Sequence, residues 1–141
     1  MKNAHILWMD TIGMDDVAQV GGKNASLGEL IHAVTPKGVR VPKGFCVTAE
    51  AYSYFLAETG LDARIATMLD GLTTKNLTDL SRRGKAVRDA IRSAPLPVRL
   101  ARTIINAYEA MEREYGKNEI VKLELESKNY QAFIKKLIQH G

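Results

Sequence analysis

The chain has 141 residues, of which 45% are hydrophobic and 26% charged, with a formal net charge of +4 at pH 7. This size and balance are those of about one globular domain with a buried core, and they exclude a low-complexity protein. A single cysteine, Cys46, excludes an internal disulfide framework; no apolar stretch is long enough to span a membrane, so we expect a cytoplasmic protein without a membrane partner.

The charge is unevenly distributed along the sequence. Residues 1–70 hold six Lys or Arg and eight Asp or Glu, whereas residues 71–141 hold 14 and eight. A basic half can attract a nucleotide or a nucleic acid, but it equally suits a solvated helix surface. Its basic stripe lacks interleaved aromatic residues, which argues against nucleic acid as a partner. The stripe comprises Arg82, Arg83, Lys85, Arg88 and Arg92.

Two short elements are predicted at the start of the chain. Residues 6–9 (ILWM) form an apolar run between polar neighbours, which is typical of a strand. A helix is expected after the sequence VGGK, ending at Pro36 and Gly38. Its predicted buried face has helical spacing and comprises Leu27, Leu30, Ile31 and Val34.

The next stretch changes from extended to helical. Residues 39–41 and 45–47 are expected to be extended around a turn at residues 42–44. Thr48 can then cap a helix that stops at Gly60. The predicted inner face of this helix includes Tyr52, Phe55 and Leu56.

Three further helical faces are predicted between residues 61 and 116. The first comprises Ile65, Met68, Leu69 and Leu72. The second comprises Leu77, Leu80, Gly84, Val87 and Ile91, and is followed by a break at residues 93–97 (SAPLP). The third comprises Val98, Ala101, Ile105, Tyr108 and Met111, and closes at Gly116.

The last 21 residues have a pattern of their own. Val121, Leu123 and Leu125 alternate with charged residues, as in a strand, and an amphipathic helix is expected from Ser127. Its apolar positions are Tyr130, Phe133, Ile134, Leu137 and Ile138. The predicted class is therefore α+β and helix-rich, with short strands and about five to six helices.

The sequence VGGK raises the question of a phosphate site. Glycines allow backbone N–H groups to converge on an anion, and a helix that starts after them adds its positive end. Lys23 adds a full charge beside Gly21 and Gly22. The spacing is that of neither a Walker A loop nor GxGxxG, and Asn24 stands where the Walker pattern has a magnesium-binding Ser or Thr. The local pattern alone thus leaves a phosphate grip and an ordinary turn both open.

No catalytic or metal site is predicted from the remaining polar residues. His5, His32 and His140 lack metal-ligand spacing. Asp15 and Asp16 suit helix capping or solvation better than catalysis, and Cys46 suits a buried small hydrophobe.

Two segments with their spacing resemble one family. VGGKNASLGEL (residues 20–30) and GVRVPKGFCVTAEAYSYFL (residues 38–56) follow Leu7-Trp8 and residues 13–17 (GMDDV). This order resembles the start of the phosphoenolpyruvate synthases (pyruvate, water dikinases). Related pyruvate phosphate dikinases and rifampicin phosphotransferases share the GGK…LGE and VPxGF-x-T-xxAY patterns. The resemblance covers residues 1–120, and we expect residues 121–141 to be a divergent tail.

The resemblance implies the first part of an ATP-grasp nucleotide-binding domain, with ATP and Mg²⁺ as cofactors. The parent reaction converts ATP, pyruvate and water to phosphoenolpyruvate, AMP and phosphate through a phosphohistidine on another domain. The family lysine that contacts ATP phosphates matches Lys23, and Gly21 and Gly22 match the loop beside it.

This sequence departs from the family after the long helix. The family continues with a V-R-S-S-A-T-A-E-D-like segment whose arginine grips ATP, whereas residues 120–127 read IVKLELES. The phosphohistidine and pyruvate-binding elements are also missing from these residues. Because phosphoryl transfer needs metal and several cations, we expect a truncated ATP-binding portion that is not catalytic alone or works with a complementing chain. The alternative is a non-enzymatic interaction module that uses the C-terminal amphipathic helix.

Overall fold

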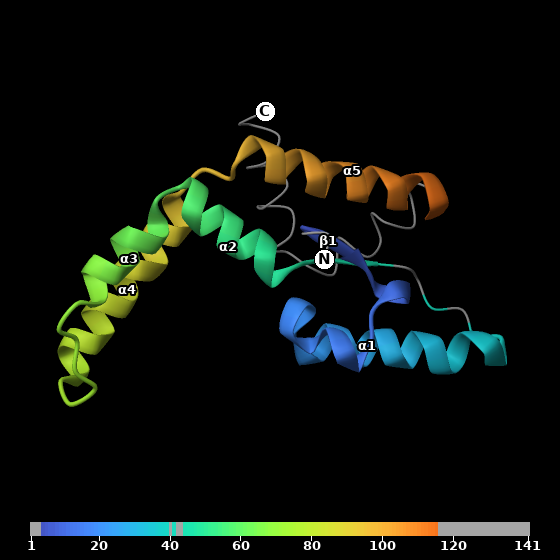
Figure 1. Ribbon diagram of the computed structural model, residues 1–141, viewed down its shortest axis with the longest axis horizontal. Coiled ribbons are helices and arrows are strands. Elements are labelled where there is room, and N and C mark those ends of the chain that lie inside the picture. Colours follow the sequence, from blue (N-terminus) through green and yellow to red (C-terminus); the bar gives the residue numbers. More distant parts are fainter. Residues whose placement is uncertain (1–3, 40, 42–43, 116–141) are drawn as a thin grey trace. The chain divides into compact units, whose positions relative to one another are not determined.

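The computed structural model describes residues 4–39, 41 and 44–115 (Figure 1). Within them it contains five α-helices, three short 3-10 turns and one two-stranded antiparallel sheet. The predicted helix-rich α+β class is confirmed. The chain divides into two compact units, one from Met1–Tyr52 with Val98–Gly141 and the other from Ser53–Pro97.

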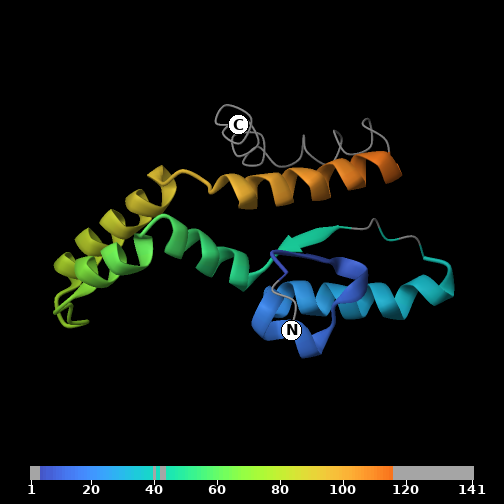
Figure 2. The same cartoon turned by 45° about the horizontal axis from the view of Figure 1, so that its top comes forward.

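The sheet of the first unit joins the two apolar runs predicted as strands. β1 (Ile6–Trp8) pairs antiparallel with β2 (Phe45–Val47), and Leu7 lies opposite Cys46. The rings of Trp8 and Phe45 meet edge to face with their centroids 5.7 Å apart, a favourable aromatic geometry. Figures 1 and 2 show α1 (Val17–Val34) and α5 (Val98–Tyr115) on opposite sides of this sheet.

The strand predicted for residues 39–41 is not formed by the two of them that the structure describes. Val39 donates its backbone N–H to the carbonyl oxygen of Val34 at 3.3 Å, and Gly38 adopts a left-handed conformation with φ 80°. The N–H of Val39 is therefore bonded to the end of the preceding helix and is not available for pairing with a strand. Residues 40, 42 and 43 lie outside the described part of the chain.

The buried face of α1 differs from the predicted one. Val20, Ala25, Gly28 and Ile31 are buried, whereas Leu27 and Leu30 are 38% and 53% exposed. The prediction was wrong for these two leucines because small residues, and not the largest apolar ones, face the neighbouring segment. That segment is the chain from Met9 to Asp16, which forms the turns η1 (Met9–Thr11) and η2 (Met14–Asp16).

Three residues of α1 hold this segment in place. A Cβ atom on Gly28 would collide with the backbone carbonyl of Ile12, so only glycine permits the observed approach. Glu29 Oε1 accepts a hydrogen bond from the backbone N–H of Met14 at 3.0 Å. His32 Nε2 donates to the carbonyl oxygen of Asp10 at 2.9 Å. Ile12 is consequently only 1% exposed and joins a core with Val20, Ala25 and Cys46.

The predicted cap of the next helix is confirmed. Thr48 Oγ1 accepts a hydrogen bond from the N–H of Ala51 at 3.2 Å and donates to the carbonyl of Ala4 at 2.8 Å. α2 (Ala49–Glu58) follows, and Gly60 ends the segment with φ 64°. Phe55 is buried as expected, but Tyr52 is exposed.

α5 also buries a different stripe from the predicted one. Leu100, Ile104 and Ala107 are buried, whereas Val98 is exposed. The other four predicted residues are half-buried and flank the buried stripe: Ala101, Ile105, Tyr108 and Met111. The break before α5 occurs at residues 94–97, as the SAPLP sequence predicts.

The second unit contains α3 (Leu61–Leu69) and α4 (Leu77–Ser93), which pack against each other. Asn76 caps α4 by accepting the N–H of Asp79 at 3.0 Å. Arg83 joins the two helices: its Nη1 donates to the carbonyls of Met68 and Asp70 at 3.0 and 2.6 Å, and its Nε to Asp79 at 2.8 Å. Thus Arg83 belongs to the framework of this unit as well as to the basic stripe.

The predicted seam on α4 is only partly correct. Ala90 is its buried residue, and the seam members Gly84, Val87 and Ile91 are half-buried. Leu77, at the first position of the helix, is 74% exposed.

The strand and amphipathic helix predicted after residue 120 lie outside the described residues, as does Gly116. None of the helices in the described ranges combines the length and the hydropathy required of a membrane span.

We expect Gly28→Ala to lower the free energy of unfolding by about 1–3 kcal/mol, because the new methyl group must push away the backbone of Ile12. Urea denaturation followed by circular dichroism measures the change. Gly22→Ala is the matched control on the same helix, since a Cβ there meets no described atom within 4 Å. Equal stability of the two variants would contradict the close approach.

We expect Arg83→Lys to lower the free energy of unfolding by on the order of 1–3 kcal/mol, because an ammonium group cannot span all three acceptors of the guanidinium. Arg82→Lys is the control: the Arg82 side chain is 71% exposed, and among the residues that the structure describes it pairs with Asp79 alone. Thermal unfolding of both variants measures the difference, and a loss of the same size in both would refute the bridging role of Arg83.

Candidate functional site

The diglycine sequence interrupts α1. Gly21 has φ 77° and ψ 156°, which is not helical and which a residue with a Cβ rarely adopts. Residues 17–20 form a short turn before this break, and residues 22–34 form the long helix after it. The bend predicted at the glycines is therefore confirmed at Gly21, whereas Gly22 already belongs to the helix.

The break creates a new helix start at Gly22. The first N–H groups of a helix lack acceptors within it and carry a partial positive charge. A Cβ atom built on Gly21 or Gly22 would meet no described atom within 4 Å, so space is open beside both residues. The start of the long helix can therefore be approached by another molecule.

Asn24 stabilises the two sides of the break. Its side-chain Nδ2 donates to the carbonyl oxygen of Val20 at 2.8 Å, across Gly21. Asn24, which stands where the Walker pattern has a magnesium-binding Ser or Thr, thus has a structural role of its own. This bond depends on the folded path at Gly21, so the order of residues alone does not predict it.

Lys23 is exposed in the first turn after the break. Within the described part of the chain, no carboxylate forms an ion pair with it. Its ammonium group is thus not neutralised by the described residues, and it lies beside the open N-terminal end of the helix. Gly21, Gly22 and Lys23 are consecutive in the chain, so their proximity follows from the sequence, and their phosphate-binding role stays a prediction.

The carboxylate pair Asp15 and Asp16 is divided between two environments. Asp16 Oδ2 accepts the N–H of Gly13 at 2.9 Å, and the N–H of Asp16 donates to the carbonyl of Gly13 at 3.0 Å. Asp16 therefore caps the turn that leads into α1, as predicted. Asp15 is exposed.

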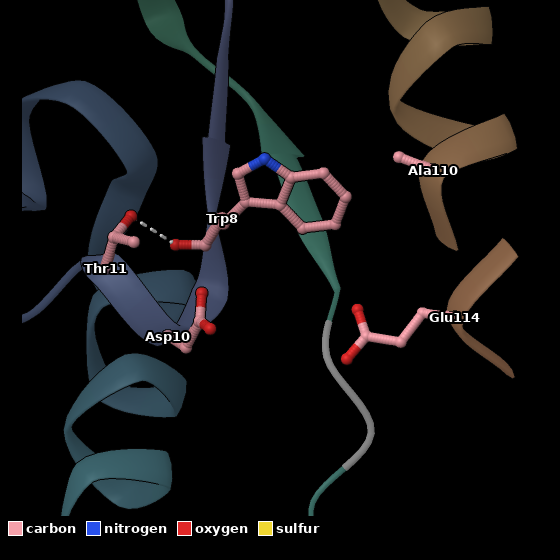
Figure 3. Close-up of a pocket in the computed structure, with 5 residues that line it drawn as sticks. All are labelled: Trp8, Asp10, Thr11, Ala110 and Glu114. Carbon is pink, nitrogen blue, oxygen red and sulfur yellow. Dashed lines mark hydrogen bonds between the residues drawn. The ribbon is translucent and has the colours of Figure 1, made fainter. Parts of the chain in front are cut away.

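A separate hollow of about 320 Å³ lies in the first unit (Figure 3). It is lined by Trp8, Asp10, Thr11, Ala110 and Glu114. Figure 3 shows the indole of Trp8 directed toward α5 and the carboxylate of Glu114 directed toward the same space. None of the three diglycine-site residues contributes to this hollow.

The remaining candidates have structural surroundings. Cys46 is buried, and burial raises the pKa of its thiol, as expected for a small core residue. Among the residues that the structure describes, no three His, Cys, Asp or Glu side chains gather as a metal site. In the basic stripe, Arg82 and Arg83 pair with Asp79, and Lys85 pairs with Asp89 at 2.6 Å.

Comparison with known proteins identifies what this arrangement is similar to. Residues 17–125 match the family model of the pyruvate phosphate dikinase AMP/ATP-binding domain. This match extends five residues beyond the predicted boundary at residue 120.

Three curated relatives carry the name phosphoenolpyruvate synthase. The protein from Neisseria meningitidis is 45% identical over 82% of this chain and 15% of its own length. The protein from Synechocystis is 44% identical over 82% of this chain and 14% of its own length. The protein from Escherichia coli is 42% identical over 73% of this chain and 13% of its own length.

The chain thus spans about one seventh of the length of these relatives. The family match begins at the first residue of α1, covers the diglycine break with Lys23, and continues past the end of α5. The chain belongs to the pyruvate phosphate dikinase AMP/ATP-binding domain family.

Proposed function

We propose that Gly21, Gly22 and Lys23 hold phosphate groups of ATP. The observation that carries this proposal is an exposed lysine, without a described ion-pair partner, in the first turn of a helix that starts behind a glycine break. Exposed N–H groups and a nearby ammonium suit a multiply charged anion. The family to which the chain belongs is described as AMP/ATP-binding, which supports a nucleotide as the source of that anion.

The three residues contribute in different ways. Gly21 supplies a backbone conformation that starts a second helix, and Gly22 leaves space for the ligand beside the first N–H groups. Lys23 supplies the full positive charge. In this proposal the backbone of the two glycines orients the phosphate group, and the Lys23 side chain supplies most of the electrostatic attraction.

We further propose that this chain, by itself, does not convert pyruvate to phosphoenolpyruvate. Phosphoryl transfer depends on metal ions and several cations placed around the reacting phosphate. The diglycine site offers one lysine and backbone dipoles, and Mg²⁺ would enter with the nucleotide rather than on a protein cluster. Conversion of pyruvate to phosphoenolpyruvate would require a complementing chain. We place both chains in the cytoplasm, because a protein with one cysteine and no disulfide framework suits a reducing compartment.

Isothermal titration with ATP, with and without Mg²⁺, tests the phosphate site. We expect Lys23→Ala to weaken binding roughly tenfold, about 1.4 kcal/mol, because it removes the charge-assisted contact. Lys37→Ala is the matched control, since Lys37 is another exposed lysine but lies beyond the opposite end of the same helix. Equal affinities for wild type and Lys23→Ala would refute the proposed grip.

Two glycine variants separate ligand contact from backbone geometry. We expect Gly22→Ala to leave the fold intact and weaken ATP binding, because its methyl group enters the open space beside the helix start. Gly21→Ala should also lower the free energy of unfolding, by about 1–3 kcal/mol, since its φ of 77° strains any residue with a Cβ. Unchanged ATP affinity in both variants, measured by the same titration, would indicate an ordinary turn.

A further inference from the structure

The side chain of Asn24 bridges the break in α1. Its Nδ2 donates to the carbonyl oxygen of Val20 at 2.8 Å. In an unbroken α-helix this carbonyl accepts the backbone N–H of the residue four positions later, which is Asn24 itself. Because Gly21 leaves the helical path, the side chain of Asn24 offers the carbonyl a donor at the point where the helix is interrupted.

The bond encloses the residues of the proposed phosphate site. Gly21, Gly22 and Lys23 are the three residues between Val20 and Asn24, and all three are exposed. The hydrogen bond therefore closes a ring around this exposed segment. Two consecutive glycines have wide conformational freedom in an open chain, and a closed ring restricts it.

The residues that flank the ring are fixed in the core. Val20 is 8% exposed, and Ala25, which directly follows Asn24, is fully buried. The segment from Gly21 to Lys23 is thus held at both ends, and the Asn24 bond restricts the path between them. A phosphate that binds there meets N–H groups already in place and does not lose affinity to the ordering of the backbone.

We infer that Asn24 is a positioning residue of the phosphate site. Its amide holds residues 21–23 in the conformation that binds phosphate, and it acts through the backbone rather than by contact with the nucleotide. This inference rests on the proposed binding of ATP phosphates by Gly21, Gly22 and Lys23.

The chemistry of the position explains why a neutral amide suits it. A carbonyl oxygen needs a donor as its partner, and asparagine supplies one without carrying a charge. An ionised aspartate has nearly the same shape but offers acceptors only, so it would repel the carbonyl of Val20. Its negative charge would also lie next to Lys23 in the chain and compete with phosphate for the ammonium group.

Backbone ¹⁵N relaxation of the full chain without nucleotide tests the positioning itself. We expect amide order parameters of about 0.85 for Gly22 and Lys23 in the wild type, as in rigid backbone, and below about 0.6 in Asn24→Asp. Asn106→Asp is the matched control, because Asn106 is an exposed asparagine of α5 and its replacement adds the same charge. Equal order parameters in the wild type and Asn24→Asp would overturn the inference.

Isothermal titration with ATP tests the consequence for binding. We expect Asn24→Asp to weaken ATP binding roughly tenfold or more and Asn106→Asp to stay within about twofold of the wild type. Asn24→Gln keeps an uncharged amide donor and should bind ATP more tightly than Asn24→Ala, which has none. This second pair also makes the comparison if far-ultraviolet ellipticity shows that Asn24→Asp does not fold. Equal affinities of Asn24→Gln and Asn24→Ala would overturn the inference, because the donor would then be irrelevant.

The outcomes separate this inference from the proposed phosphate site. Weaker binding in both Lys23→Ala and Asn24→Asp, with recovery in Asn24→Gln, supports both. Weaker binding in Lys23→Ala together with wild-type affinity in Asn24→Asp overturns the positioning role and leaves the phosphate site standing. Wild-type affinity in Lys23→Ala refutes the phosphate site, and the positioning role with it.

Discussion

The close approach of Gly28 to the backbone of Ile12 is the constraint on which the rest of the first unit depends. It allows the segment from Met9 to Asp16 to lie directly on α1, where Glu29 and His32 bind its backbone. Because Ile12 is thereby buried with Val20, Ala25 and Cys46, the same contact joins α1 to β2. A three-residue strand pair alone could not hold these elements, since isolated short hairpins are marginally stable.

This packing also fixes the direction in which the diglycine site opens. Val20 is buried immediately before the break, and Ala25 is buried soon after it, so both sides of Gly21 are anchored in one core. Asn24 adds a hydrogen bond across the gap. Lys23 therefore emerges from a rigid bend, and a bound anion would not have to order the backbone that receives it.

The sequence predicts the elements of this fold better than their faces. Spacing and capping residues identify α2, α4 and α5 with nearly correct ends, because Thr48, the SAPLP sequence and Gly60 act locally. The face of α1 is shifted because periodicity gives weight to large apolar residues, whereas Ala25 and Gly28 are buried by virtue of being small. The stripe of α5 is shifted by one position, to Leu100, Ile104 and Ala107, and residue size does not explain that shift.

At the candidate site, too, the sequence predicts local features better than contacts between distant residues. The glycines and Lys23 are evident from composition and order alone. The role of Glu29 is not, because its bond to Met14 joins residues 15 positions apart and depends on the folded path. Likewise, the three acceptors of Arg83 lie in α3, at the residue just after it and in α4, and no local pattern specifies how these helices pack.

The position of Trp8 has a practical consequence. It is the single tryptophan of the chain, its ring packs on Phe45 of β2, and it faces the hollow beside α5. Its emission spectrum is therefore an intrinsic reporter of the unit that contains the diglycine break, whereas the α3–α4 pair belongs to the other unit. Followed together with far-ultraviolet ellipticity, which registers every helix, it distinguishes one cooperative transition from two independent ones without any introduced label.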